Sequence, residues 1–335
     1  MNKILPAEWA EQKFVQLTWP HAGTDWEYML EEVNDCFVNI AHEIIKREDL
    51  LIVCQEAGKV KRLLGDIDFS KITFAEMPTN DTWARDHGGI TVFRNGKTVI
   101  YDFTFNGWGL KFAANHDNQI TRFLFENGVF GENIYYLDCL DFVLEGGSIE
   151  SDGAGTLLTT ANCLLSDNRN NKTKVEIEFK LKELFGVNQV LWITHGYLAG
   201  DDTDSHVDTL ARLCSVDTIA YVKCEDEADE HFEALKKMEL ELQTFQSSNF
   251  KPFQLIPLPM ADAVYEDGER LPATYANFLI INGAVLMPTY NSPKDKIAIK
   301  QLQKAFPDRE IVGVNCLALI KQHGSLHCVT MQYPK

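Results

Sequence analysis

The spacing of apolar residues along the chain predicts five helices. The clearest pattern runs from about Asp25 to Arg47, where apolar side chains recur at positions i, i+3, i+4 and i+7. This spacing puts them on one face of a helix that can pack against a sheet. Similar helical patterns recur later in the chain, at about 115–126, 172–185, 225–245 and 293–306.

Short runs rich in β-branched and aromatic residues lie between these helices and predict strands. Two hairpin turns are indicated by Asn95-Gly96 and Asn282-Gly283, each of which separates two such runs. Groups of about three strands alternating with single helices predict a mixed α/β fold of five similar modules. The runs are LLIVC (50–54), ITVF (90–93), TVIYDF (98–103), IYYL (134–137), TLLTT (156–160), VLWIT (190–194), TIAYV (218–222), FLIIN (278–282), AVLMPTY (284–290) and IVGVN (311–315).

Polar clusters with loop-like glycines recur at nearly regular intervals. They are centred on Asp86, Glu145, His206 and Cys328, which are 59, 61 and 122 residues apart. A missing fifth position is expected near residue 267, in the polar segment EDGERLPATYAN. Five units of about 60–67 residues around a centre would bring these loops together. Because no linker divides the sequence, we expect one domain over residues 1–335.

Composition is that of a globular protein, with 45% apolar and 24% charged residues among 335. The formal net charge of −18, from 31 basic and 49 acidic residues, argues against nucleic acid and anionic membranes as partners. It suits a cationic substrate, although acidity that simply keeps the protein soluble is the favoured explanation. The sequence shows no secretion signal and no run of about 18 apolar residues, so we expect a cytoplasmic protein.

Eight cysteines are scattered singly, without a CxxC pair, and are expected to be reduced thiols, mostly in the core. Cys328 differs in its context, HGSLHCVTMQYP (323–334), which indicates a junction between a loop and a strand. A thiol attacks only as its thiolate, so a catalytic Cys328 would need a nearby base or cation. Judged from this segment alone, a packed core thiol is the favoured interpretation.

The segment GDDTDSHVDTLARL (200–213) surrounds one histidine with four aspartates. His206 and Asp208 alternate in what is interpreted as the start of a strand, so both would face one side. A carboxylate beside an imidazole can hold its tautomer and support proton transfer near neutral pH. A solvated acidic loop is one alternative. A metal site is the less favoured one, because no HxxxH, HxH or CxxC pattern accompanies it.

Two further clusters combine carboxylates with paired glycines. PTNDTWARDHGGI (78–90) sets Trp83 three residues before Asp86, a combination suited to a planar cation through cation–π contact and bidentate hydrogen bonds. The alternative is a turn with an ion pair between Arg85 and Asp86. In LEGGSIES (144–151), Glu145 precedes two glycines, and alone it could be a charge at a strand end.

Taken together, these clusters offer one thiol, one imidazole and three carboxylates. A neutral carbonyl substrate would be met by hydrogen-bond donors rather than by carboxylates. A guanidinium group fits better because it is planar, carries five N–H donors and stays protonated at physiological pH. The residues therefore favour a nucleophilic hydrolase acting on a guanidinium carbon.

The motifs also resemble those of a known family. WARDHGG, DFTFNGWGLKF (102–112), LEGGSIES, TLLTTANCLLSDNRN (156–170), DSHVD, PATYANFLIINGAVLMPTYN (272–291) and GSLHCVT are similar to segments of the agmatine deiminases, within the bacterial peptidylarginine deiminase superfamily. The resemblance covers nearly the whole chain, from PAEW near residue 6. It implies a five-bladed α/β propeller (pentein fold) of ββαβ units.

The resemblance implies a role for each matched residue. Cys328 is the implied nucleophile, and His206 the general acid and base. Asp86 and Asp208 are implied to hold the guanidinium, and Glu145 to orient His206.

Less specific matches surround that set. Asp202 is implied to face the substrate, while Trp83 and Trp108 resemble aromatic pocket residues. Two segments depart from the family pattern: Gln322-His323-Gly324 replaces a run of glycines, and Ser205 replaces a glycine. Both departures lie in loops that would shape the pocket. His327 is interpreted as structural, and His195 is a weak candidate for the pocket.

The implied reaction is hydrolysis of agmatine to N-carbamoylputrescine and ammonia through an S-amidino-cysteine, without metal or organic cofactor, in polyamine and putrescine synthesis. Three alternatives stay open: a deiminase of arginine, methylarginine or peptidyl-arginine, an amidinotransferase, and a non-catalytic guanidinium-binding protein. The sequence leaves open whether the chain forms a homo-oligomer.

Overall fold

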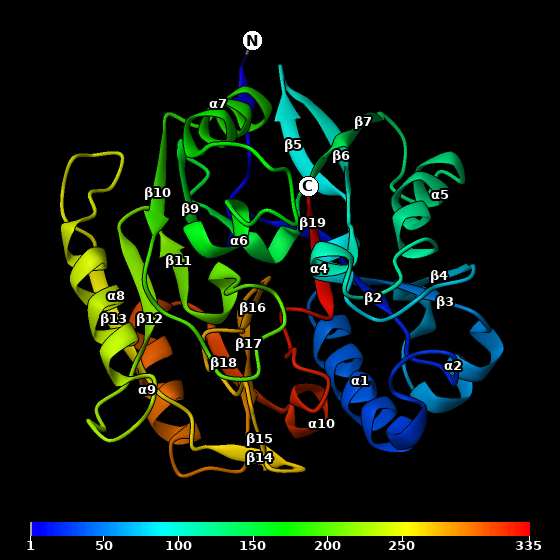
Figure 1. Ribbon diagram of the computed structural model, residues 1–335. Helices are drawn as coiled ribbons and strands as arrows, with labels where there is room; N and C mark the ends of the chain where they lie inside the picture. Colours follow the sequence, from blue (N-terminus) through cyan, green and yellow to red (C-terminus); the bar gives the residue numbers. More distant parts are fainter. Residues whose placement is uncertain (1) are drawn as a thin grey trace.

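The computed structural model describes residues 2–335 (Figure 1). All five predicted helices are present, each beginning two to seven residues later than the pattern indicated. The delay before α1 and α5 comes from 3₁₀ turns, η1 (Glu27–Met29) and η3 (Asp117–Gln119). The start of α7 is fixed by a capping box in which the side chains of Thr173 and Glu176 bind each other's backbone N–H groups. The five helices are α1 (Leu30–Ile45), α5 (Ile120–Glu126), α7 (Lys174–Phe185), α8 (Phe232–Thr244) and α9 (Asp295–Ala305).

Five further helices within residues 2–335 were not predicted. All but one are single turns too short to carry an apolar period, and two of them support the site described below. They are α2 (Ala57–Leu64), α3 (Ala84–His87), α4 (Gly107–Leu110), α6 (Ala161–Leu164) and α10 (Leu317–Ile320).

Each of the ten predicted apolar runs forms a strand. Both hairpins are confirmed, since Arg94 pairs with Lys97 and Ile281 with Ala284 across the two-residue turns. The strands are β3 (Asp49–Cys54), β5 (Ile90–Arg94), β6 (Lys97–Thr104), β7 (Ile134–Val143), β9 (Thr156–Thr160), β10 (Gln189–Ile193), β12 (Thr218–Lys223), β16 (Leu279–Ile281), β17 (Ala284–Thr289) and β18 (Glu310–Asn315).

Further strands lacked a clear signal in the sequence. In β13, two prolines interrupt the apolar pattern, which is tolerated because this strand lies at the edge of its sheet. These strands are β1 (Lys3–Ile4), β2 (Gln12–Thr18), β4 (Ile72–Glu76), β8 (Ile149–Ser151), β11 (Ala211–Ser215), β13 (Gln254–Pro259), β14 (Val264–Glu266), β15 (Glu269–Leu271) and β19 (Thr330–Pro334).

Five of the six sheets share one plan: an antiparallel strand pair, a helix, and a third strand parallel to the second. The plan holds for β5-β6-α5-β7, β8-β9-α7-β10, β11-β12-α8-β13, β16-β17-α9-β18 and β19-β2-α1-β3. This is the ββαβ order expected of the modules. In the last sheet the C-terminal strand β19 pairs with β2, so the two ends of the chain share one sheet. The closed five-bladed ring stays a prediction.

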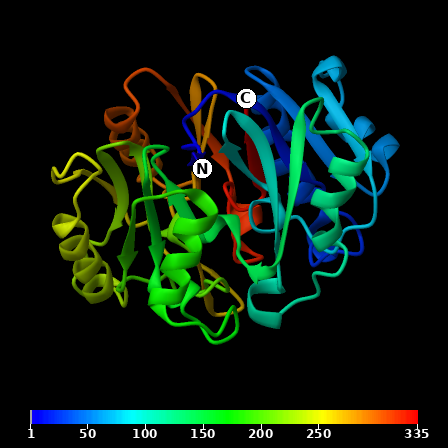
Figure 2. The ribbon, with the colours of Figure 1, turned by 90° about the horizontal axis from the view of Figure 1, so that it is seen from above.

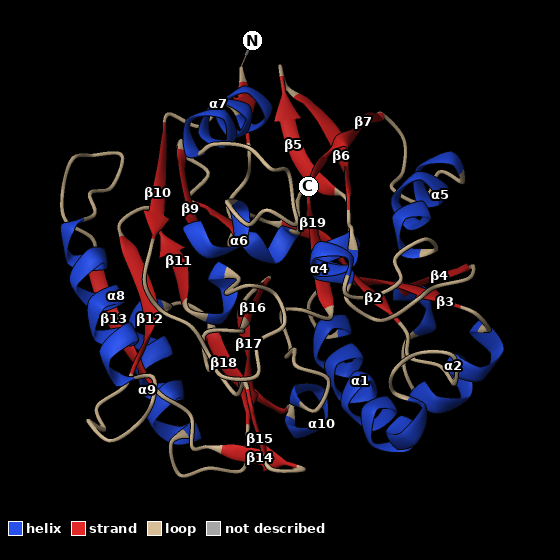
Figure 3. Ribbon diagram, in the orientation of Figure 1, coloured by secondary structure: helices blue, strands red, loops and turns tan. Residues whose placement is uncertain are grey.

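The helices α5, α7 and α8 lie on the outer side of their strands (Figure 3). Seen from above, the C-terminal segment lies in the middle, with earlier segments around it (Figure 2). The buried apolar side chains form two clusters, one of which includes Cys328. No helix within residues 2–335 has the length and apolar character needed to cross a bilayer.

Candidate active site

Three of the predicted site residues meet around Gly147. If Gly147 carried a Cβ atom, that atom would lie 2.7 Å from His206 Nδ1, 2.9 Å from Asp86 Oδ1 and 3.0 Å from Asp208 Oδ2. Since Cβ contacts below 3.0 Å essentially never occur, only glycine leaves room for these side chains. The backbone after Glu145 therefore forms part of the wall of the site.

The site side chains are held by short turns rather than by strands. Asp86 lies in α3, and Glu145 immediately precedes the 3₁₀ turn η4 (Gly146–Ser148). The predicted strand at His206 and Asp208 is wrong. His206 precedes a 3₁₀ turn, η5 (Val207–Thr209), that contains Asp208 and leads into β11. Both side chains still reach Gly147, so the expected common orientation is retained by a different backbone.

Asp86 is buried and accepts two hydrogen bonds, from Trp108 Nε1 at 2.9 Å and from the Gly147 N–H at 3.1 Å. Burial, together with the negative charges of Asp208 and Glu145, raises the pKa of Asp86 well above its usual range. The alternative ion pair with Arg85 is not formed. The Arg85 Nε instead donates to the His327 carbonyl at 3.4 Å.

Two tryptophans form the aromatic side of the site. Trp108 contacts Asp86 directly and meets the ring of Trp83 edge-on, with 6.0 Å between the ring centroids. Trp83 donates from Nε1 to Asp81 Oδ2 at 3.0 Å. A Cβ atom on Gly324 would lie 2.0 Å from a Trp83 ring carbon, so this one glycine of the divergent segment 322–324 is sterically required.

His206 is fully buried, and neither of its ring nitrogens has a hydrogen-bond partner within residues 2–335. Its Nδ1 lies 3.7 Å from Asp86 Oδ1. Burial lowers the pKa of His206 to about 4, an effect that Asp208 partly opposes. The imidazole is therefore neutral at physiological pH and able to accept a proton.

Glu145 is also fully buried, and Arg169 binds one of its oxygens, with Nε donating to Oε1 at 2.7 Å. The other oxygen, Oε2, has no partner among the described residues. A Glu145 oxygen lies within 4.8 Å of a His206 ring nitrogen. That proximity is compatible with the predicted orienting role, which stays a prediction. The sequence analysis did not single out Arg169, although it lies within the matched segment 156–170.

Asp208 differs from Asp86 in having a histidine side chain as its hydrogen-bond partner. His327 Nδ1 lies 2.7 Å from Asp208 Oδ2, and His327 Nε2 lies 2.8 Å from Glu8 Oε2. Burial alone would raise the pKa of Asp208, but the hydrogen bond and charge of His327 lower it below its usual value. His327, which the sequence indicated only as structural, is thus in direct contact with a predicted site residue.

Behind Asp208 lies a buried ionic network that the sequence did not predict. Arg212 donates to Glu150 Oε1 at 2.5 Å and to Glu8 Oε2 at 2.6 Å. Glu8 also accepts from the Ile280 N–H at 2.7 Å. Charges this deeply buried are tolerated only when paired and hydrogen-bonded. The network therefore fixes the position of His327, and through it that of Asp208.

Cys328 lies before β19, as expected, and its Sγ donates to Asn277 Oδ1 at 3.4 Å. Burial and the charges of Asp208 and Asp86 raise the pKa of this thiol well above its usual range. Asn277 is the last residue of the fifth polar segment. The fifth loop position of the site, which was expected near residue 267, does not lie there, because residues 264–271 form the separate hairpin β14–β15.

A cleft of about 430 Å³, including its opening to solvent, reaches Asp86 and Cys328 from the surface. Asp202 lies at its rim with 42% of its side chain exposed, 3.9 Å from His323 Nδ1. His195 lies elsewhere, half exposed and 3.1 Å from Glu241. The lining residues are Asp25, Asp81, Trp83, Asp86, Trp108, Phe112, Asp202, Thr203, Gln322, His323, Gly324 and Cys328.

Comparison with known protein families shows which family the chain belongs to. The sequence profile of the Porphyromonas-type peptidyl-arginine deiminase family matches residues 4–334. The chain belongs to this family. The resemblance inferred from the motifs is confirmed, and it extends over almost the entire length.

Agmatine deiminases are among the proteins that are similar to this chain. The agmatine deiminase of Pseudomonas aeruginosa is 30% identical over 98% of this chain and 95% of its own. A cysteine-to-serine variant of the C. jejuni agmatine deiminase, solved with substrate bound, is 39% identical, with a TM-score of 0.93 over 100% and 97% of the two chains. A structure from Porphyromonas gingivalis, provisionally described as an arginine deiminase, is 54% identical, with a TM-score of 0.96 over 100% and 99%.

Proposed function

We propose that this protein is an agmatine deiminase that hydrolyses agmatine to N-carbamoylputrescine and ammonia. The observation that carries the proposal is a thiol, a neutral imidazole and two carboxylates beside one acidic cleft. The raised pKa of Asp86 marks a place where a bound cation would relieve repulsion between carboxylates. Agmatine deiminases at 30% and 39% identity, matched over nearly the full chain, support the same activity.

The proposed chemistry begins with the guanidinium held by Asp86 and Asp208. His206 takes the proton of Cys328, and the thiolate attacks the central carbon. His206 then gives that proton to the departing nitrogen, which leaves as ammonia, and a thiouronium intermediate remains. His206 next removes a proton from water, and the resulting hydroxide attacks the same carbon. Collapse of the adduct breaks the C–S bond, and the hydroxyl proton passes to the sulfur as the ureido product leaves. His206 then releases the proton it took from water to solvent.

The far end of the cleft favours an amine tail. Asp25, Asp81 and Asp202 all line it, and burial together with Asp25 raises the pKa of Asp81 to about 7. The nearby Lys111 is already engaged, since its Nζ lies 3.1 Å from Asp204 Oδ1. An ammonium group would be attracted to this region, whereas the carboxylate of free arginine would be repelled. We propose Asp202 as one contact for the tail.

A substrate panel tests the proposal against its alternatives. The enzyme is incubated with agmatine, free arginine and a peptidyl-arginine, and both ammonia and the ureido product are followed. We expect agmatine to give the highest kcat/KM. The Asp202→Asn variant should raise KM for agmatine while changing kcat little, because the exchange removes an attraction to the tail and leaves the reacting groups in place. Preference for arginine would favour the activity suggested for the P. gingivalis relative. Amidine transfer to an added amine would identify a transferase, and no ammonia from any substrate would overturn the assignment.

The raised thiol pKa predicts a specific pH dependence. In the free enzyme Cys328 keeps its proton near neutral pH, so kcat/KM should rise with pH as the thiolate forms. A bound guanidinium places positive charge beside the same carboxylates and should lower the thiol pKa, shifting the rise in kcat to lower pH. Both parameters are measured across neutral and alkaline pH, where the guanidinium stays protonated. The prediction would be wrong if kcat and kcat/KM rose at the same pH, or if kcat/KM did not change with pH.

We also propose that residues 1–335 act as one catalytic domain whose five modules surround the cleft. A cytoplasmic location is proposed because all eight cysteines are free and buried, as expected of a reducing compartment. The product, N-carbamoylputrescine, would place the enzyme in putrescine and polyamine synthesis.

A further inference from the structure

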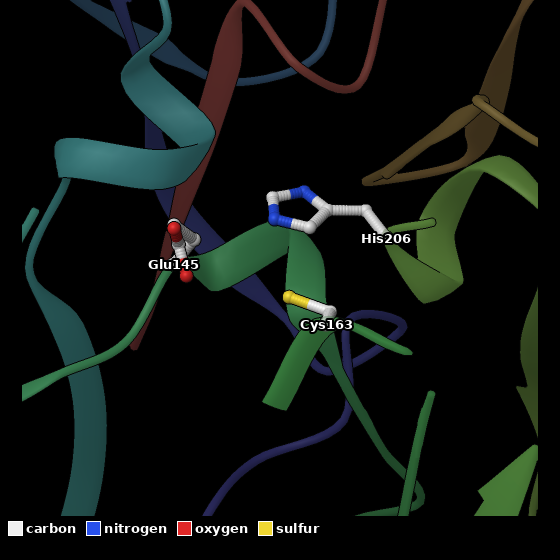
Figure 4. Close-up of side chains that lie close together, drawn as sticks. All are labelled: Glu145, Cys163 and His206. Carbon is white, nitrogen blue, oxygen red and sulfur yellow. The ribbon is translucent and has the colours of Figure 1, made fainter. Parts of the chain in front are cut away.

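A second thiol lies close to the imidazole and the glutamate of the site. Glu145, Cys163 and His206 each direct one donor atom into a common space, and these atoms all lie within 4.8 Å of one another (Figure 4). All three side chains are fully buried. They come from the residue before η4, from α6 and from the residue before η5, so the fold itself brings them together.

Two of the three side chains have unused hydrogen-bonding capacity. Glu145 Oε2 and both ring nitrogens of His206 lack partners within residues 2–335. Unsatisfied buried polar atoms are rare, because a polar atom removed from water without a new partner destabilises the fold. A second carboxylate, that of Asp86, lies 3.7 Å from His206 Nδ1, and Arg169 binds Glu145 through only one of its oxygens.

We propose that Glu145, Cys163 and His206 form a binding site for Zn²⁺ or a similar borderline-soft divalent ion, and that occupancy of this site inhibits the enzyme. The donor set of sulfur, nitrogen and oxygen is one that Zn²⁺ accepts, whereas Mg²⁺ and Ca²⁺ require mainly oxygen. Zinc–ligand bonds of about 2.0–2.3 Å would draw the donor atoms to roughly 3.5 Å apart. The donor atoms must therefore approach one another by about 1 Å when the metal binds.

Binding would release a proton. Cysteine binds metal as its thiolate, so Cys163 must give up its S–H proton. The metal forms a bond to sulfur as the S–H proton leaves to solvent, so apparent affinity rises with pH. No change of oxidation state is involved.

The inhibitory effect rests on the proposed function, whereas the binding itself does not. A His206 nitrogen bound to metal cannot accept or donate the proton that hydrolysis needs. Substrate and metal are both cations that would lie beside His206, so agmatine should weaken metal binding. A chelator should restore activity fully, because nothing covalent has changed.

The experiment uses Co²⁺ as a visible substitute for Zn²⁺ in the full-length chain. A cobalt–thiolate bond gives a charge-transfer absorption in the near ultraviolet. We expect this band in the parent protein, in Cys328→Ala and in Cys139→Ala, a matched control for loss of a buried thiol. We expect its loss in Cys163→Ala. The Zn²⁺ concentration that halves agmatine turnover should rise at least about tenfold in Cys163→Ala, relative to that variant's own metal-free rate.

Each outcome decides the matter. A band that disappears in Cys328→Ala but persists in Cys163→Ala would move the site to the proposed nucleophile and overturn the inference. Absence of the band from the folded parent, verified by circular dichroism, would also overturn it. If the band follows Cys163 but no guanidine compound is hydrolysed, the metal site stands and the proposed function fails. If agmatine is turned over normally and Zn²⁺ does not change the rate, the inhibitory site is refuted and the proposed function stands.

Discussion

Replacing Cys328 with alanine is expected to reduce agmatine turnover by at least about 10⁴-fold, because no other group in the cleft can form the covalent intermediate. The other thiol near the site, Cys163, is not among the residues that line the cleft. Substrate binding should survive, since Asp86 and Asp208 are untouched and the alanine removes a group that Asp208 and Asp86 repel when ionised. Ammonia release measures turnover, and a thermal shift with agmatine measures binding.

The control is Cys139→Ala, which removes a buried thiol far from the proposed chemistry and should retain activity close to the parent's. Acid quenching of the parent during turnover, followed by mass spectrometry, should reveal a peptide containing Cys328 that carries agmatine less one ammonia. The same adduct should be absent from Cys328→Ala. Substantial turnover by Cys328→Ala would show that a different nucleophile acts and would remove the basis of the mechanism.

The side chains of Asp86 and Asp208 are chemically identical but have different hydrogen-bond partners in this site. Asp208 is kept ionised by His327, whereas Asp86 has only neutral hydrogen-bond donors, Trp108 and the Gly147 N–H. The pKa of Asp86 is therefore raised and that of Asp208 lowered. A guanidinium arriving between them would find one carboxylate already charged and would bring the second into its charged form. Such a site prefers a cation over a neutral ligand of the same shape.

The elements that the sequence predicted best are those with a local periodic signal. The five predicted helices and the ten apolar strands are all present, and the errors among them lie at helix starts, where 3₁₀ turns precede α1 and α5. The site residues Asp86, Glu145 and His206 were found because each occupies a loop at a similar place in successive ββαβ units. Asn277 departs from this interval because the hairpin β14–β15 is inserted before it.

The supporting network could not be predicted for a physical reason. Its contacts join residues very distant in sequence: Glu8 and His327 are 319 positions apart, and Arg212 and Glu8 are 204 apart. A single glutamate near the N-terminus carries no periodic or motif signal that would pair it with a histidine at the other end. The turn at His206 was likewise misassigned, because alternation over three residues fits either a strand or a 3₁₀ turn.

Replacement of His206 with glutamine should lower kcat for agmatine by about 10³-fold, the usual range for loss of a general acid and base. Glutamine can still form hydrogen bonds but cannot carry the proton from the thiol to the leaving nitrogen. KM should change little, because the guanidinium is held by Asp86 and Asp208. The matched control is His195→Gln, an exposed histidine paired with Glu241, which should keep the parent's activity.

A burst experiment separates the two proton transfers assigned to His206. If His206 serves both steps, the variant should lose the rapid first release of ammonia as well as the steady rate. Mass spectrometry during turnover should then show no build-up of the thiouronium adduct on Cys328. Accumulated adduct would mean that another group protonates the leaving nitrogen and that His206 acts only on water. An unchanged kcat would remove His206 from the chemistry altogether, and its two unpartnered nitrogens would then need a different explanation.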